Sequence, residues 1–115
     1  MNKLMLSGGE LVIARDVMID LVLHSLSFFS PYVKPFAPLV KNIVNIHNKT
    51  VKNGVELQTV ENEGFKLYLH LSFLYGEDIA LRSFQIQNQI KKDLEDMTGL
   101  SIREVNITVE RVHFD

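Results

Sequence analysis

The sequence contains no cysteine, and this absence removes several classes of functional site at once. Without thiolates the chain has no disulfide framework, no cysteine-ligated zinc or iron–sulfur site and no cysteine nucleophile. Its 115 residues, of which 46% are hydrophobic, are enough to bury a core without such cross-links. We therefore expect one domain over residues 1–115 that needs no metal and no cofactor to fold.

An excess of positive charge is also missing. The chain has 12 Lys and Arg against 14 Asp and Glu, a formal net charge of −2. Binding to phosphate backbones or anionic lipids normally requires a basic surface. Nucleic acid is therefore not an expected partner.

Long hydrophobic runs are absent as well. The longest apolar stretch, residues 17–29, is interrupted by Asp20 and His24 and is shorter than the roughly 20 residues of a membrane helix. The opening residues lead into a Ser-Gly-Gly-Glu segment rather than a secretory signal. With only 6 glycines and 3 prolines, the composition is that of a folded domain. The lack of cysteine fits a reducing, cytoplasmic location.

Apolar and polar residues alternate most clearly over residues 65–73, which predicts a half-buried strand. Residues 54–59 predict a second strand, and the polar, glycine-bearing residues 61–64 predict a turn between the two. These two strands should pair antiparallel as a hairpin.

Two helices are well marked. Residues 14–29 predict the first, whose apolar residues occupy most of its circumference, so it needs cover on more than one side. A long helix follows Tyr75 and Gly76 and ends at Gly99, a residue type that suits the left-handed position after a helix. Its apolar stripe consists of Ile79, Ile86, Ile90, Leu94 and Met97.

A short additional helix is expected after the three prolines at 31, 35 and 38. There Leu39, Val40, Ile43 and His47 recur at helical spacing. Its expected role is to cover the side of the first helix that the sheet does not reach.

Residues 10–13 and 102–114 predict the first and last strands. The last should bury Val105, Ile107 and Val109, and its apolar phase then shifts, which suggests a bulge near Glu110 and Arg111. The order β-α-(α)-β-β-α-β predicts a two-layer α+β fold, with a small mixed or antiparallel sheet and the helices packed on one face. The other face should be open and carry Lys66, Tyr68, His70, Ser72, Asn106 and Thr108, with Glu56 and Gln58 as further candidates.

No residue pattern indicates catalysis. The four histidines have no metal-ligand spacing, and Asp20 and His24, four residues apart on one helix, are interpreted as an ordinary surface pair. Glu77 and Asp78 are assigned to the start of a helix, where negative charge offsets the helix dipole. The segment after Leu6 lacks the spacing of a phosphate-binding loop, and no nucleophile–base pair is evident, so the chain is not expected to be an enzyme.

Candidate interaction residues lie on two elements. Leu81 and Phe84 fall opposite the apolar stripe of the long helix, beside Gln85 and Asn88. Either the additional helix or the N-terminus covers them, or they form an exposed apolar contact patch with a polar rim.

The open sheet face offers a small second platform through Tyr68 and His70. Because RNA-recognition domains have a similar element order, a divergent RNA-binding domain is the alternative to a protein-binding module.

Several segments, in order, resemble the alkaline shock protein family of mainly Gram-positive bacteria. They are residues 9–14 with Val17, residues 53–57, residues 75–79, residues 97–100 and residues 105–109. The family differs from this chain after the first helix, where its usual Gly-Val is replaced here by a proline-containing segment.

The resemblance implies a non-enzymatic, cytosolic protein linked to stress response and cell-envelope homeostasis. Its partner would be another protein or a second copy of the chain, and a separate protein would hold some members at the membrane.

Overall fold

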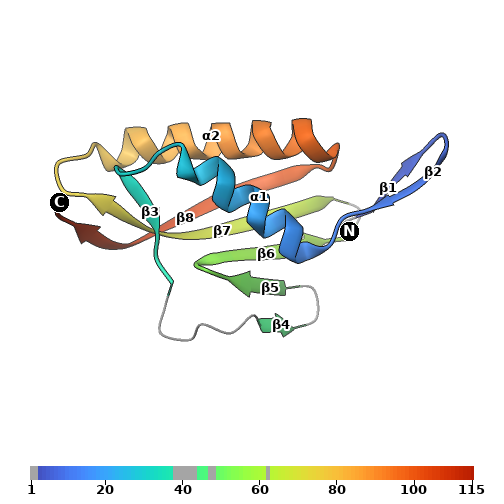
Figure 1. The fold of residues 1–115 in the computed structure, drawn as a ribbon, viewed down its shortest axis with the longest axis horizontal. Helices are drawn as coiled ribbons and strands as arrows, with labels where there is room; N and C mark the ends of the chain where they lie inside the picture. The colour runs from blue at the N-terminus through green and yellow to red at the C-terminus, as the bar shows by residue number, and fades with distance from the viewer. Residues whose placement is uncertain (1–2, 38–43, 47–48, 62) are drawn as a thin grey trace.

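The computed structural model describes residues 3–37, 44–46, 49–61 and 63–115 (Figure 1). Along the chain the elements are β1 (Lys3–Leu6), β2 (Gly9–Val12), α1 (Arg15–Ser27), β3 (Val33–Pro35), β4 (Val44–Ile46), β5 (Lys49–Lys52), β6 (Val55–Val60), β7 (Gly64–Leu74), α2 (Ile79–Thr98) and β8 (Ile102–His113).

The main sheet is organised around β7. One edge of β7 pairs antiparallel with β6 along residues 64–69 and with β3 along residues 71–73, and β5 and β4 continue the sheet beyond β6. The other edge pairs with β8, which runs parallel to β7. Parallel strands need a long crossover connection, and α2 provides it. The predicted hairpin of residues 54–59 and 65–73 is thus confirmed, and the sheet is mixed.

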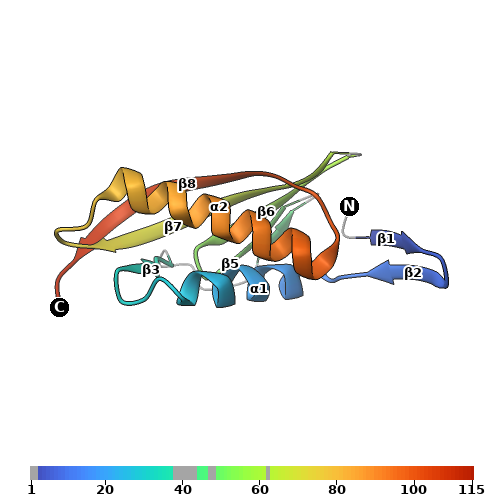
Figure 2. The ribbon, with the colours of Figure 1, turned by 90° about the horizontal axis from the view of Figure 1, so that it is seen from above.

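Both helices lie on one face of this sheet, as the two views in Figures 1 and 2 agree. The predicted α+β class, with an open sheet covered by helices on one side, is therefore confirmed. The core between the layers is built mainly from apolar side chains. Its fully buried side chains include Met18, Ile19 and Val22 from α1, Phe65, Leu67, Leu69, Leu71 and Phe73 from β7, and Ile86, Ile90 and Leu94 from α2.

Among the described elements, the second cover for α1 comes from α2. Ser25 Oγ on α1 donates a hydrogen bond to Asp93 Oδ2 on α2 at 2.8 Å. The additional helix predicted after Pro38 is wrong where the structure describes that segment, because Val44–Ile46 form β4 and pair with β5. Two of the three residues of β4 are β-branched and favour strands. Leu39, Val40, Ile43 and His47 lie outside the described residues.

The first predicted strand forms, but not in the main sheet. Residues 9–12 are β2, and they pair antiparallel with β1 in a separate two-stranded sheet that projects from one end of the molecule (Figures 1 and 2). The two-residue turn of Ser7 and Gly8 gives β2 this local partner. Among the side chains of this hairpin, Met5, Leu6 and Val12 are more than half exposed.

The predicted bulge in the last strand is confirmed. Leu71 pairs with Val109 and the next residue of β7, Ser72, pairs with Arg111, so Glu110 is the extra residue. The predicted burial of Val109 is wrong, since this side chain is 40% exposed. A bulge increases the local twist of a strand. The helix layer consequently covers the sheet less completely here than at Val105, which is 8% exposed.

Candidate functional site

Capping residues fix the two ends of α2. Asp78 is the N-cap, and its Oδ1 accepts a hydrogen bond from the Leu81 backbone N–H at 3.1 Å. Gly99 follows the last helical residue in the left-handed conformation, with φ 73°, as predicted. The helix between them turns Ile86 and Ile90 into the core. Ile79 and Met97, at the ends of the predicted stripe, are 39% and 53% exposed, so the stripe is buried only in its middle.

Leu81 and Phe84 are exposed on the side of α2 that faces away from the core. Leu81 is 54% exposed and Phe84 is 61% exposed, and Gln85 and Asn88 beside them are also exposed. Neither an additional helix nor the N-terminal hairpin covers them in the part of the chain that the structure describes. Together these four residues form what we call the α2 patch: Leu81, Phe84, Gln85 and Asn88.

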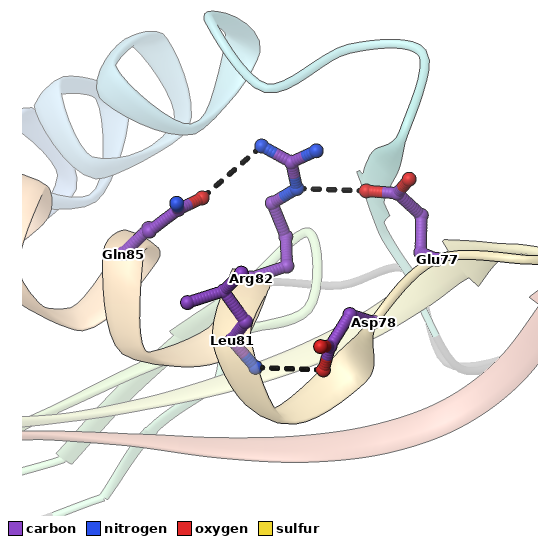
Figure 3. A pocket seen from close by; sticks show the side chains of 5 residues that line it. All are labelled: Glu77, Asp78, Leu81, Arg82 and Gln85. Atoms are coloured by element: carbon purple, nitrogen blue, oxygen red, sulfur yellow. Dashed lines mark hydrogen bonds and ion pairs between the residues drawn. The ribbon is translucent and has the colours of Figure 1, made fainter.

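The polar rim of the α2 patch is held in place by a network at the start of the helix. A hollow of 140 Å³ at this point is lined by Glu77, Asp78, Leu81, Arg82 and Gln85. Figure 3 shows these five side chains. Arg82 donates from Nε to Glu77 Oε1 at 2.7 Å and from Nη1 to Gln85 Oε1 at 3.1 Å. Its guanidinium also lies 5.1 Å from the centre of the Tyr32 ring.

Glu77 and Asp78 therefore have structural roles, in a form slightly different from the predicted one. Both precede the first helical turn, where Asp78 caps a backbone N–H and Glu77 pairs with Arg82. Each of the three charged groups around the hollow thus has a partner within the protein, an ion pair for Glu77 and Arg82 and a backbone N–H for Asp78.

A second hollow, of 270 Å³, lies between α1 and the C-terminal half of α2. It is lined by His24, Ser25, Phe28, Asp93, Asp96 and Met97. The His24 ring lies edge-on to Phe28 with centroids 5.2 Å apart, whereas Asp20 accepts a hydrogen bond from Lys52 Nζ at 3.1 Å. The predicted surface pair of Asp20 and His24 is thus replaced by two separate contacts.

Ion pairs line the exposed side of α2 near this hollow. Lys92 Nζ donates to Asp96 Oδ2 at 2.7 Å, and this hydrogen bond, with the negative charge of Asp96, raises the pKa of Lys92. Such pairs at i and i+4 support a helix surface and require no ligand.

Tyr68 and His70 lie on the opposite face of the sheet from the helices. Each is half-buried; Tyr68 stands between Glu56 on β6 and Asn106 on β8, and His70 Nδ1 is 3.6 Å from Glu110 Oε1. The structure therefore does not bring the six candidate residues together. Leu81, Phe84, Gln85 and Asn88 form one surface, and Tyr68 and His70 belong to another.

Ser72 was expected on the open face but is buried, with 6% of its surface exposed. Its Oγ is 2.8 Å from His113 Nδ1, and His113 Nε2 is 3.0 Å from the Pro31 carbonyl oxygen. The last strand and the loop after α1 therefore cover this end of the open face. Sequence reasoning missed this contact because it joins residues 41 and 82 positions apart.

Over the described residues, no three His, Asp or Glu side chains cluster in a way that would hold a metal ion. His24, His70 and His113 have separate partners, and His47 lies outside the described part of the chain. Neither α1 nor α2 combines the length and apolar character that a membrane crossing requires.

Comparison with models of known protein families shows which family the chain belongs to. The model of the alkaline shock protein 23 family, described by a cell envelope-related function, matches residues 7–114. The chain belongs to the alkaline shock protein 23 family. No curated protein and no solved structure matches the chain. The match confirms the resemblance found in the sequence and extends from β2 to the end of β8.

The later segments that carry the resemblance to the alkaline shock protein 23 family lie at the two ends of α2 and within β8. Residues 75–79 contain the N-cap of α2, residues 97–100 contain its C-terminal glycine, and residues 105–109 form the centre of β8. The α2 patch lies between these segments.

Proposed function

We propose that this chain is a non-catalytic protein-interaction module that serves cell-envelope homeostasis and stress response by binding another protein through the α2 patch. The observation that carries the proposal is the exposure of Leu81 and Phe84 at 54% and 61% on a helix whose opposite side is buried along its middle turns. An exposed apolar pair inside a polar rim has the composition of an interface centre.

The free energy gained by covering apolar surface favours the α2 patch as a binding site. Covering apolar surface contributes roughly 25 cal/mol per Å², and aromatic side chains at the centre of an interface contribute most of the binding energy. Phe84 has one of the largest exposed apolar side chains in the described chain. Arg82 and Gln85 are already hydrogen-bonded to each other, so the rim needs little reordering when a partner binds.

The chemistry of the described residues supports a binding role over a catalytic one. The charged residues around the hollow at the start of α2 are engaged in a helix cap and an ion pair. A nucleophile requires a neighbouring base and a third group that orients the base. Ser72 and His113 come closest, but Ser72 is buried and the second His113 nitrogen faces the Pro31 carbonyl oxygen.

Attachment to the membrane through a separate partner protein is part of the proposal. A protein bound at the α2 patch would place the module at the envelope without any membrane-crossing segment in the module itself. The resemblance to alkaline shock proteins motivates this arrangement.

The test is Phe84→Glu, with Met97→Glu as the matched control on the same helix. Both side chains are more than half exposed, so both variants should fold and melt close to the parent chain. In-cell cross-linking should lose specific envelope-associated partners with Phe84→Glu and retain them with Met97→Glu. An identical set of cross-linked proteins for the parent and for Phe84→Glu would contradict the proposal.

A further inference from the structure

The outer edge of β8 faces away from β7. This strand spans 12 residues and pairs with β7 along one edge, and no other described strand pairs with it. Unpaired strand edges expose backbone N–H and C=O groups that can bond to another strand.

The hydrogen bonds of β7 show which residues of β8 face outward. The N–H and C=O of His70 bond to Gly54 and Phe36. The backbone groups of the β7 residues on either side of His70 therefore point toward β8 instead. In a parallel ladder, Leu69 bonds to the residues that flank its partner Ile107. The backbone groups of Val105, Ile107 and Val109 therefore point away from β7.

Side chains of α2 close the first part of this edge. The Ile102 N–H donates to Glu95 Oε2 at 2.9 Å, Lys91 Nζ donates to the Ile102 carbonyl oxygen, and Gln87 Nε2 donates to the Val105 carbonyl oxygen at 3.0 Å. From Ile107 onward, no side chain in the described part of the protein bonds to the outward-facing backbone groups. The edge is therefore protected at its start and open over residues 107–114.

The open part of the edge is accompanied by apolar side chains on the helix face. Val109 and Val112 are each 40% exposed, and Ile79 at the start of α2 is 39% exposed. Tyr75 and Phe114 stack at the end of the strand with ring centroids 5.1 Å apart and are 70% and 73% exposed. This is more exposed apolar surface than the protected half of β8 carries.

The sequence of this segment is self-complementary. Residues 107–114 read Ile-Thr-Val-Glu-Arg-Val-His-Phe, and their midpoint lies between Glu110 and Arg111. Positions at equal distances from the midpoint match in character: Val109 with Val112, Thr108 with His113, and Ile107 with Phe114. Two copies of the segment placed antiparallel would set each of these positions opposite its match.

The bulge places the valine side chains on either side of the midpoint on the same face of the sheet. Without an extra residue, Val109 and Val112 would point to opposite faces, since side chains alternate along a strand. Because Glu110 is the bulged residue, Val109 and Val112 pair with Leu71 and Phe73 of β7, whose side chains both point into the core. A second copy carries the same bulge, so the spacing of outward-facing residues would match on both strands.

The charged residues at the midpoint, Glu110 and Arg111, favour the same antiparallel register between two copies. Glu110 lies 3.6 Å from His70 and keeps a partly exposed side chain, while Arg111 is exposed and has no ion pair among the described residues. Antiparallel pairing about the midpoint places each Arg111 opposite the Glu110 of the other copy. Like charges directly opposite each other would be destabilising, and opposite charges stabilise the pair.

We propose that two copies of this chain pair antiparallel through residues 107–114 of β8, about a two-fold axis between Glu110 and Arg111, and so form one continuous sheet. The interface is isologous, because the same segment contributes from both copies. It goes beyond the proposed function by naming a second copy as a partner, and it uses a surface separate from the α2 patch.

Charge reversal tests the register on the full chain. Arg111→Glu alone places acid opposite acid twice, and Glu110→Arg alone places base opposite base twice. Each single variant should raise the dimer dissociation constant at least tenfold in sedimentation equilibrium, with the fold verified by circular dichroism. The chain carrying both substitutions restores two opposite-charge pairs and should dimerise like the parent.

An equimolar mixture of the two single variants should form a mixed dimer, because every pair in it is again Glu opposite Arg. A parent chain that stays monomeric overturns the proposal, as does a mixture that fails to associate. If Phe84→Glu abolishes the dimer while both charge reversals leave it intact, copies associate through the α2 patch and the β8 interface is wrong. Conversely, a β8 dimer that persists in Phe84→Glu leaves the α2 patch free for its own partner.

Discussion

Backbone conformation at single residues fixes a tight turn of the main sheet. Between β5 and β6, Asn53 and Gly54 both have positive φ, 51° and 83°, in a two-residue turn that joins paired Lys52 and Val55. Such turns require left-handed residues at both positions, and Asn-Gly is their preferred sequence. The carbonyl oxygen of Gly54 then accepts a hydrogen bond from the His70 N–H at 2.8 Å, which ties the turn to β7.

Three glycine-to-alanine variants separate conformational strain from close contact. A Cβ at Gly54 would lie 2.6 Å from the Phe36 carbonyl oxygen, whereas Gly76 has positive φ with open space around it and Gly8 has neither constraint. We expect Gly76→Ala to lower the free energy of unfolding by about 1–2 kcal/mol and Gly54→Ala by more. Gly8→Ala should have little effect. Urea titration checks the order; equal losses at positions 54 and 76 would mean that Phe36 shifts without cost.

At the scale of elements, α2 has two sides with different tasks. Its middle turns close the core through Ile86, Ile90 and Leu94, while Lys91 and Glu95 reach across to the backbone of Ile102. One helix thus buries the sheet and protects the first part of an edge strand. Its remaining side, which carries the α2 patch, contributes to neither task.

Alanine substitutions on the two sides of α2 should have different effects. Ile86→Ala or Ile90→Ala removes a fully buried branched side chain and should cost roughly 2–5 kcal/mol of unfolding free energy. Leu81→Ala removes a half-exposed side chain and should cost well below 2 kcal/mol. Denaturant unfolding of a verified monomer checks the contrast. A Leu81→Ala loss as large as that of Ile90→Ala would mean that another segment covers the patch.

For the whole molecule, the distribution of charge opposes nucleic-acid binding. The net charge is −2, and the open face places Glu56 beside Tyr68, Glu104 within 4.0 Å of Lys66 and Glu110 within 3.6 Å of His70. Lys66 and His70 on this face are thus accompanied by carboxylates. A surface that binds RNA instead combines stacking aromatics with a basic groove.

We therefore expect no shift of mixed single-stranded RNA by the chain at physiological salt in electrophoretic assays. Salt-sensitive binding that Tyr68→Ala abolishes would favour the RNA-binding alternative. The same binding unaffected by Tyr68→Ala would place any RNA contact elsewhere on the molecule.

Short-range patterns in the sequence determined the elements that are locally encoded. Alternation over residues 65–73 and the helical stripe around Ile86 and Ile90 each predict a structure whose stabilising contacts repeat at a fixed spacing. Gly99 predicts a helix end through its own backbone conformation. The phase shift at Glu110 revealed the bulge for the same reason. Asn53-Gly54 carried an equally local signal for a hairpin, which would have located β5 ahead of β6.

Only the tertiary structure decided how these elements are placed. The sequence did not show that β2 pairs outside the main sheet, that α2 provides the second cover of α1, or that His113 buries Ser72. It also left open whether Leu81 and Phe84 are exposed. Each of these facts depends on contacts between distant parts of the chain. Because apolar residues bury equally well against many partners, periodicity reveals that a side chain is buried but not what covers it.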